Sequence, residues 1–317
     1  MTDNAQAAVF PGQGSQRPGM ARDFFDEYDL ARRVFAEAEE ASGADLSEIC
    51  FAEEDERLNL TEFTQPCILT AEIAAFRVLQ EEFGYNPAFF GGHSLGEYSA
   101  LVAAGAIPFA DAVKIVRKRG ALMQGAVPPG VGAMAAVILE GIGDTDFQAI
   151  TEASGAEIAN WNSASQVVIS GKREAVEAAA AALREKLSGG KGPEEGGADI
   201  RFLEVSAPFH SSLMKDIEAE FQEFLAGFSA SFQPEKAQGV LSNFTGDFHK
   251  AQEMTENLVR QISGSVKWVE NMKTLMARAG DILEIGPNRP LGKFFASVGG
   301  EAKSVINVRS IKRVFKK

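Results

Sequence analysis

The 317-residue chain contains only two cysteines and three histidines. Cys50 and Cys67 are too few for a disulfide framework, and with three histidines they cannot supply a structural zinc site. No apolar run approaches the ~18 residues that a membrane-spanning helix needs. The polar start, MTDNAQ, lacks the basic and apolar regions of a signal peptide. We therefore expect a cytoplasmic chain with no membrane partner and no metal.

Positive charge is also scarce, since 31 Lys and Arg face 44 Asp and Glu and leave a net charge of −13. A chain this acidic is a poor ligand for nucleic acid, which we exclude as the main partner. The basic residues that gather from Ile311 to Lys317 are interpreted as a solvated tail. Hydrophobic residues make up 45% of the chain, which is typical of a globular protein.

Apolar periodicity predicts strands and helices in alternation. Strands are expected at 7–10, 88–91, 239–243, 282–285 and 304–308, and helices at 20–42, 94–104, 109–124, 212–228, 254–262 and 266–279, with a further helix that follows TQP at 64–66. Short strands that turn directly into helices are typical of an open sheet with helices packed on it.

Between residues 131 and 203 the order of elements changes. Strands are expected at 133–139, 156–161, 166–170 and 200–205, and helices at 144–153 and 173–187. This β-α-β-β-α-β order, within about 75 residues, is that of a ferredoxin-like fold. The predicted fold class is therefore α/β, with a large α/β-hydrolase-like domain that contains a parallel sheet (1–130 and 204–317) and an inserted ferredoxin-like subdomain (131–203).

A glycine-rich stretch from Ser188 to Ala198 lies near the end of the inserted unit. Its composition predicts a mobile loop. Its lysine, Lys191, is followed by Gly192 rather than by Ser or Thr, so it does not match a phosphate-binding loop.

A candidate nucleophile lies in the segment GHSLG at 92–96, which matches G-x-S-x-G between an expected strand and an expected helix. In that setting the hydroxyl of Ser94 is exposed on a tight turn. The helix N-terminus offers backbone N–H groups, notably that of Leu95, to a developing oxyanion. The pentapeptide alone is common, and a plain tight turn is the alternative.

A serine nucleophile needs a base, and only His93, His210 and His249 are available. His93 adjoins the serine, and since neighbouring side chains of an extended chain point to opposite sides, we interpret it as structural. His249 lies in a polar, surface-like loop. His210 follows an expected strand on a proline-containing loop, where α/β domains gather functional groups. We predict that His210 is the base; a histidine that only caps the next helix is the alternative.

Two further features can bind a substrate. Arg119 interrupts the apolar stripe of its expected helix, and a buried guanidinium needs an anionic partner. That partner is a carboxylate of the chain itself or a substrate carboxylate held by two parallel hydrogen bonds, unless the side chain snorkels to solvent. Gln13 lies between two glycines after the first strand, and its N–H is a candidate second oxyanion donor; a surface turn is the alternative.

These segments resemble, in the same order, the malonyl-CoA:acyl carrier protein transacylases of bacterial-type fatty acid synthesis. The resemblance spans nearly the whole chain and rests on FPGQGSQ (10–16), TQP (64–66), GHSLGEY (92–98), RG (119–120), GAM (132–134) and APFH (207–210). It implies that Ser94 is acylated and that His210 is its base. It also implies that Arg119 binds the malonyl carboxylate and that the N–H groups of Gln13 and Leu95 form the oxyanion hole.

The resemblance further implies that a backbone carbonyl orients the histidine in place of an acid. Gln261 resembles the residue that provides this carbonyl, and Asn162 resembles a position that lines the pocket. Replacement of the Gln261 side chain is then expected to be mild, because the carbonyl remains. The long glycine-rich stretch, 188–198, departs from the family pattern.

The expected function is the transfer of malonyl from malonyl-CoA to the phosphopantetheine thiol of acyl carrier protein, through a malonyl-Ser94 ester in a ping-pong mechanism. No cofactor is expected beyond the coenzyme A thioester substrate. An acidic carrier protein is expected to dock on a local basic surface, and the family expectation is a monomer. One alternative is a serine hydrolase or thioesterase of α/β-hydrolase type, although no HGGG-type oxyanion loop is present. A non-catalytic docking scaffold is the other.

Overall fold

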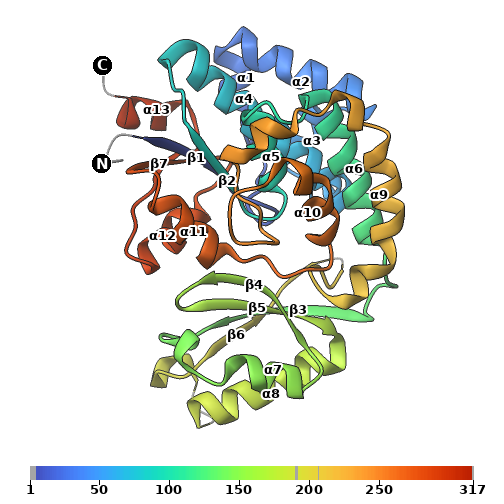
Figure 1. The fold of residues 1–317 in the computed structure, drawn as a ribbon, viewed down its shortest axis with the longest axis vertical. Helices are drawn as coiled ribbons and strands as arrows, with labels where there is room; N and C mark the ends of the chain where they lie inside the picture. Colours follow the sequence, from blue (N-terminus) through green and yellow to red (C-terminus); the bar gives the residue numbers. More distant parts are fainter. Residues whose placement is uncertain (1–4, 190–191, 206, 316–317) are drawn as a thin grey trace.

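Two β-sheets form the frame of the molecule in a computed structural model, which describes residues 5–189, 192–205 and 207–315 (Figure 1). A parallel sheet has the strand order β2-β1-β7-β8, and an antiparallel sheet has the order β4-β5-β3-β6. The strands are β1 (Gln6–Phe10), β2 (Phe89–Gly92), β3 (Gly132–Ile138), β4 (Glu157–Ser163), β5 (Gln166–Lys172), β6 (Asp199–Phe202), β7 (Asp281–Ile285) and β8 (Lys303–Val305).

Helices surround these sheets, and among the described residues none is long and apolar enough to span a membrane. The α-helices are α1 (Arg22–Glu27), α2 (Asp29–Ser42), α3 (Leu46–Phe51), α4 (Thr61–Phe83), α5 (Gly96–Ala103), α6 (Phe109–Gly125), α7 (Phe147–Ala153), α8 (Arg173–Ser188), α9 (Glu218–Ala226), α10 (Met254–Arg260), α11 (Trp268–Met276), α12 (Pro290–Ser297) and α13 (Val308–Val314).

The parallel sheet is covered on both faces, which explains the uninterrupted apolar sequence of its strand β1. Ala7 and Val9 pack into a cluster with Trp268 of α11. Ala8 and Phe10 point the other way, into the main core formed with α2, α4, α5 and α6. A strand buried on both faces has no polar alternation, as expected for a parallel sheet between helices.

Helices α4 and α6 cross at very short range, and this crossing matters for the site. A Cβ atom on Gly120 of α6 would lie 2.4 Å from the carbonyl oxygen of Thr61 in α4, so only glycine fits there. The close approach brings the neighbouring Arg119 beside Gln65 of α4.

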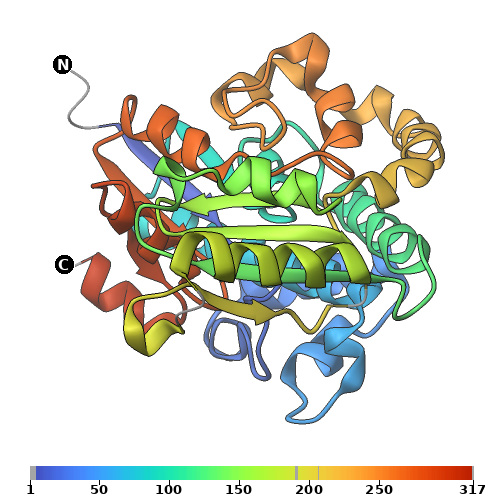
Figure 2. The ribbon, with the colours of Figure 1, turned by 90° about the horizontal axis from the view of Figure 1, so that it is seen from below.

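One face of the antiparallel sheet packs against helices. The other face is turned toward the larger unit, which is built around the parallel sheet. Along β3, Ala133, Ala135 and Val137 pack with α7 and α8. Figure 2 shows these two helices covering the outer face of the sheet. Met134 and Ala136, on the opposite face, belong to the main core cluster instead. The sheet therefore forms a wall over the parallel-sheet unit.

Several expected elements differ from the structure. The helix expected at 212–228 begins as a 3₁₀ helix over Ser212–Ile217, and the strands expected at 200–205 and 304–308 end at Phe202 and Val305. The region 20–42 contains two helices separated at Tyr28, whose extended backbone (ψ 122°) breaks the run. Helix α4 begins at Thr61 and includes Pro66, so the proline lies inside the helix and not near its start. The expected strand 239–243 is reduced to isolated bridges, in which Val240 pairs with Phe90 and Leu241 pairs with Phe248.

The basic C-terminal segment is not a solvated tail over its described part. Ile311 in α13 is buried, and the ring of Phe315 packs against Phe83 and Tyr85 at centroid distances of 5.6 and 5.8 Å. The remaining residues 316–317, like residues 1–4 of the polar start, lie outside the described residues. The glycine-rich stretch is described except for 190–191, and Pro193–Glu195 forms a 3₁₀ turn within it.

Candidate active site

Ser94 lies at the sharp turn between β2 and α5, with a positive φ of 52°. Left-handed backbone is unfavourable for a residue with a side chain, and such strain is retained where the surroundings enforce it. The two glycines of the motif provide the space, since a Cβ on Gly92 would lie 1.9 Å from Gly96, and one on Gly96 would lie 2.1 Å from the Phe10 carbonyl oxygen. The G-x-S-x-G spacing is therefore a packing requirement that presents the serine hydroxyl at the turn.

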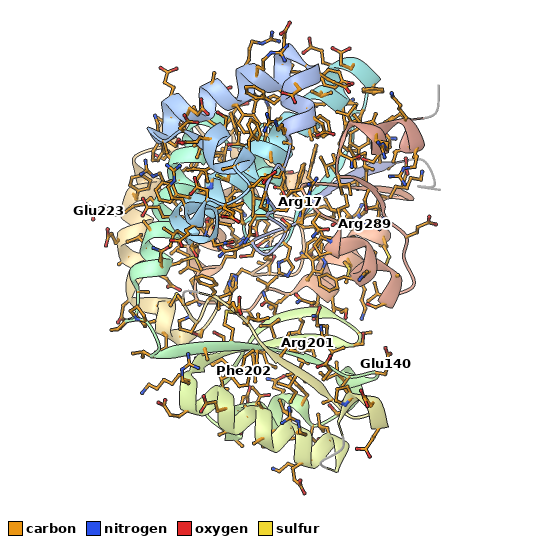
Figure 3. The ribbon with its side chains drawn as sticks, turned by 180° about the vertical axis from the view of Figure 1, so that it is seen from behind. Arg17, Glu140, Arg201, Phe202, Glu223 and Arg289 are labelled. Atoms are coloured by element: carbon orange, nitrogen blue, oxygen red, sulfur yellow. The ribbon has the colours of Figure 1, made fainter. Side chains whose placement is uncertain are left out.

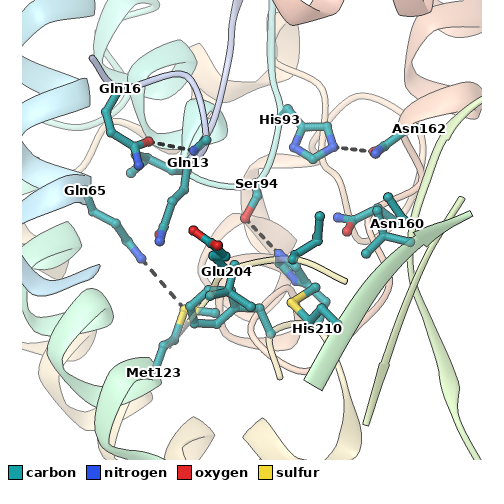
Figure 4. A pocket seen from close by; sticks show the side chains of 18 of the residues that line it. Gln13, Gln16, Gln65, His93, Ser94, Met123, Asn160, Asn162, Glu204 and His210 are labelled. Atoms are coloured by element: carbon teal, nitrogen blue, oxygen red, sulfur yellow. Dashed lines mark hydrogen bonds between the residues drawn. The ribbon is translucent and has the colours of Figure 1, made fainter. Parts of the chain in front are cut away.

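His210 contacts this hydroxyl, with 2.8 Å between its Nε2 and Ser94 Oγ (Figure 4). Its Nδ1 is 2.8 Å from the backbone carbonyl oxygen of Gln261. A carbonyl only accepts, so Nδ1 carries the proton and Nε2 is left free to accept one from the serine. Among the described residues no carboxylate is hydrogen-bonded to His210.

The electrostatic surroundings keep His210 neutral. Burial, followed by the positive charge of Arg119, lowers the pKa of His210 to about 3. Burial disfavours the charged imidazolium, and a nearby cation acts in the same direction. The imidazole is therefore a neutral acceptor across the physiological pH range.

Arg119 is 1% exposed and is held by neutral partners. Its Nη1 donates to Gln65 Oε1 at 2.9 Å, and its Nη2 donates to Gln261 Oε1 at 2.9 Å and to Ser94 Oγ at 3.2 Å. Within the described part of the chain no carboxylate forms an ion pair with it, and the side chain does not reach solvent. Both non-catalytic explanations offered by the sequence are thus wrong, and burial lowers the pKa of this guanidinium.

The two residues that carry the candidate oxyanion donors also line the cavity at Ser94. Leu95 precedes the first turn of α5, and Gln13 lies in the loop after β1. That loop is held close to the sharp turn at Ser94, hereafter the elbow, because a Cβ on Gly12 would lie 2.3 Å from the His93 carbonyl oxygen. In the described residues neither of these two N–H groups has a hydrogen-bond partner. Both remain available to an anionic oxygen.

A cavity of about 670 Å³ opens over Ser94, between the parallel-sheet unit and the antiparallel sheet. Its walls include Met134, Asn160, Asn162 and Val168 from the antiparallel sheet, and residues 203–205 continue its rim beyond β6. Phe202, at the end of this edge strand, is 49% exposed (Figure 3). Ser94 and His210 both line this cavity, so a substrate bound in it reaches the serine.

His93 lines the same cavity, although its position in the sequence predicted a structural role alone. Its Nε2 lies 2.7 Å from Asn162 Oδ1, and its ring packs edge-on against Trp268 at a centroid distance of 5.6 Å. Burial lowers the pKa of His93. Asn162 thus lies at the pocket as expected, and its amide holds the His93 ring in place (Figure 4).

A buried polar network that was not predicted from the sequence lies behind the serine. Asn243 accepts the Ser94 N–H through Oδ1 at 2.6 Å and donates from Nδ2 to the Gly92 carbonyl at 2.7 Å, which fastens the two sides of the elbow. The backbone N–H of Asn243 in turn donates to Glu97 Oε2 at 2.9 Å. The available signal was a polar Ser-Asn pair directly after an apolar run.

His249 belongs to this network and does not lie in a surface loop as expected. It is 2% exposed, and its Nε2 lies 2.9 Å from Glu97 Oε1. The polar character of its neighbours in sequence was misleading, because only the folded chain brings it beneath α5. Among the described residues, no group of three or more His, Cys, Asp or Glu side chains could hold a metal ion.

Comparisons with known proteins agree with this geometry. A family model described as acyl transferase domain matches residues 8–281. The malonyl CoA-acyl carrier protein transacylase of Escherichia coli strain K12 is 42% identical over 293 residues, which cover 90% of each chain. The crystal structure of the malonyl-CoA:acyl carrier protein transacylase from Xanthomonas oryzae is 34% identical, with a TM-score of 0.89 over 99% of this chain and 98% of that one.

A further solved structure contains a malonyl-transacylase in complex with its type II PKS acyl-carrier protein. It is 35% identical and superposes with a TM-score of 0.88 over 99% of both chains. These similarities extend over nearly the whole chain and include each segment that builds the site. The chain therefore belongs to the malonyl CoA-acyl carrier protein transacylase family of acyl transferase domains.

Proposed function

We propose that this chain transfers the malonyl group of malonyl-CoA to the phosphopantetheine thiol of acyl carrier protein, and so supplies fatty acid synthesis. One observation carries the proposal: Ser94 Oγ lies 2.8 Å from a neutral, carbonyl-oriented histidine and 3.2 Å from a buried arginine that has no carboxylate partner among the described residues. A nucleophile, its base and an unpaired cation at one point fit an acyl group that carries its own carboxylate.

Acylation begins when His210 Nε2 takes the proton of Ser94 Oγ as this oxygen attacks the thioester carbonyl carbon. The negative charge that develops on the carbonyl oxygen is stabilised by the N–H groups of Leu95 and Gln13. Collapse of the tetrahedral intermediate breaks the C–S bond, and the departing coenzyme A thiolate receives the proton from His210. The product is a malonyl-Ser94 ester.

Deacylation repeats these steps with the carrier thiol. His210 takes the thiol proton, sulfur attacks the ester carbonyl, and the Ser94–acyl bond breaks with return of the proton to Oγ. The enzyme thus needs no cofactor for the transfer, and coenzyme A enters only as the substrate thioester.

The malonyl carboxylate is proposed to bind Arg119. Pairing with this carboxylate offsets the positive charge that helps to keep the pKa of His210 low, so the correct acyl group makes the base stronger when it binds. Gln65 and Gln261 each accept from one terminal nitrogen of the guanidinium, and the nitrogen bound to Gln261 also donates to Ser94 Oγ.

The finer architecture and setting form part of the same proposal. We assign residues 1–130 and 204–317 to an α/β-hydrolase-like domain and 131–203 to a ferredoxin-like subdomain. The strand order β4-β5-β3-β6 and the β-α-β-β-α-β sequence of elements support the second assignment. We propose a cytoplasmic location, supported by two free, buried cysteines, and a monomer that docks its acidic carrier on a local basic surface.

A serine hydrolase or thioesterase of α/β-hydrolase type is the alternative, since it shares the elbow. A hydrolase that acts on neutral acyl groups has no use for a buried arginine beside its nucleophile, and burying an unpaired guanidinium is costly. The arginine therefore favours transfer of a carboxylated acyl group.

Intact-mass measurement after brief incubation with malonyl-CoA tests the proposal. We expect a malonyl adduct on the wild-type protein, its absence in Ser94→Ala, and its transfer to added carrier protein. Rapid loss of the adduct to water, with no gain by the carrier, identifies a hydrolase. A protein that never forms the adduct is a docking scaffold, and an adduct mapped to another residue refutes Ser94 as the nucleophile.

A further inference from the structure

The proposed mechanism leaves one buried ionisable pair unused, His249 and Glu97. Both side chains are 0% exposed, and His249 Nε2 lies 2.9 Å from Glu97 Oε1. The other ring nitrogen, Nδ1, lies 3.3 Å from Asn257 Nδ2. An amide nitrogen only donates, so Nδ1 accepts and Nε2 carries the proton that is donated to Glu97.

Glu97 accepts hydrogen bonds from three donors. Besides His249, its Oε2 accepts the backbone N–H of Asn243 at 2.9 Å and the side-chain amide of Gln261 at 2.7 Å. A buried carboxylate is tolerated when it is hydrogen-bonded in this way. The three donors together hold the Glu97 carboxylate in one orientation. When one donor is lost, the carboxylate can rotate.

The amide of Gln261 connects this carboxylate to the substrate-binding cation. Arginine has donors only and a carboxylate has acceptors only, so an amide between them fits in a single orientation. Its Nε2 donates to Glu97 and, at 3.0 Å, to the Ser94 carbonyl, while its Oε1 accepts from Arg119 at 2.9 Å. The backbone carbonyl of the same residue orients His210.

We infer that His249 and Glu97 are positioning residues that set the acyl selectivity of the site, because they fix the Gln261 amide that holds Arg119 against the malonyl carboxylate. This inference rests on the proposed function. Neither residue touches substrate in this scheme. Their loss lets the amide turn its nitrogen toward Arg119, where two donors repel each other, and the guanidinium leaves its place.

The experiment compares the acylation rate with malonyl-CoA to that with acetyl-CoA in single-turnover mass measurements. His249→Leu removes the donor at nearly constant volume, and His249→Gln restores an N–H near the same place. Glu97→Gln keeps the shape of the side chain and removes the charge. Tyr85→Phe is the matched control, since it removes a buried hydrogen bond to the Ala7 carbonyl (2.9 Å) outside the network.

We expect the malonyl-to-acetyl rate ratio to fall about tenfold or more in His249→Leu and Glu97→Gln, as for a lost hydrogen bond to a charged group. His249→Gln recovers part of this ratio. Tyr85→Phe lowers the melting temperature but keeps the malonyl-to-acetyl ratio of the wild type. The two losses are not additive in the double variant, because both act through Gln261.

Other outcomes separate the two proposals. If the wild type forms no malonyl adduct, the proposed function fails irrespective of the network. If the wild type is acylated and Glu97→Gln keeps its ratio, the pair is only structural and the inference is overturned. Should His249→Leu fail to fold, Glu97→Gln and His249→Gln decide, since a ratio unchanged in both contradicts the inference.

Discussion

Gln261 makes one hydrogen bond through its backbone carbonyl and three through its side chain, and these bonds join His210, Arg119, Ser94 and Glu97. The family resemblance predicted the role of the carbonyl but not that of the amide. The amide's partners lie up to 167 positions away, so local sequence could not indicate them. The sequence led us to expect a mild effect of Gln261→Ala; from the structure we expect a marked loss of activity instead, because this change leaves Arg119 and Glu97 with unsatisfied buried groups.

We assign the acyl selectivity of the proposed reaction to Arg119. Removal of one partner of a buried charge pair costs about 3–5 kcal/mol, or roughly two to four decades in rate. Arg119→Ala is expected to lose malonyl transfer by that amount while it retains acetyl transfer. Arg119→Lys is expected to restore malonyl transfer only in part, because the point charge of lysine lacks the forked donors of arginine. The measurement is the ratio of the two transfer rates. An equal fall of both rates indicates a structural arginine.

The pH dependence of the reaction follows from His210. Since its pKa is lowered to about 3 from the usual 6.5, the base stays deprotonated well below neutral pH. We expect kcat/KM for a malonyl thioester without phosphate groups to stay level from pH 8 to pH 5, because this parameter reports the free enzyme. A fall centred near pH 6.5 contradicts the expectation.

The same shift has a consequence for stability. The unfolded chain binds a proton at His210 below about pH 6.5 and the folded chain does not, so this group lowers the free energy of unfolding as the pH falls from there toward 3. The effect is absent above pH 7. Acid unfolding, followed by circular dichroism, is expected to be less steep in His210→Gln.

At the scale of elements, the sequence best predicted the strands, turns and helices whose positions depend on the local pattern of residues. The first strand, the elbow and helix α6 lie within two residues of their expected positions, because apolar periodicity and tight-turn glycines act over short range. The expected start of α4 after TQP was wrong, since the helix already begins at Thr61, where α4 packs against Gly120 of α6. Residues 239–243 run beside β2 but form only isolated bridges, a distinction that depends on long-range register.

The packing of α5 on β1 gives a prediction at this scale. Gly96→Ala places a methyl group 2.1 Å from the Phe10 carbonyl oxygen and forces the helix away from the strand. We expect a loss of about 1–3 kcal/mol in the free energy of unfolding, together with loss of acylation. Gly125→Ala, at the end of α6 with no atom within 4 Å of the added Cβ, is the control. It is expected to be stabilising by up to about 1 kcal/mol with normal acylation, and equal effects in both variants contradict the argument.

At the scale of the whole molecule, Glu72 in α4 affects global stability. Burial raises the pKa of this carboxyl well above its usual 4.5, with Glu284 adding a smaller effect in the same direction. The folded chain thus binds a proton that the unfolded chain releases above pH 4.5, so the contribution of this group to stability is lost as the pH rises. Glu72→Gln is expected to gain stability relative to the wild type from pH 5 to pH 8 in urea unfolding.

The control for this measurement is Glu301→Gln, which changes an exposed carboxyl. Its difference from the wild type is expected to be small and the same at both pH values. If Glu72→Gln shows a difference as constant as that of the control, the carboxyl of Glu72 is ionised in the folded protein.

The two sides of the cavity contribute different kinds of residue to the proposed reaction. The elbow, the base and the arginine come from the larger unit, whereas Met134, Ala136 and Val168 of the antiparallel sheet only line the opposite wall. Substitutions in that wall alter the room for an acyl chain without touching any reacting group. Substrate range and chemical competence can therefore diverge along separate mutational paths, which lets a lineage explore bulkier acyl groups while its chemistry is preserved.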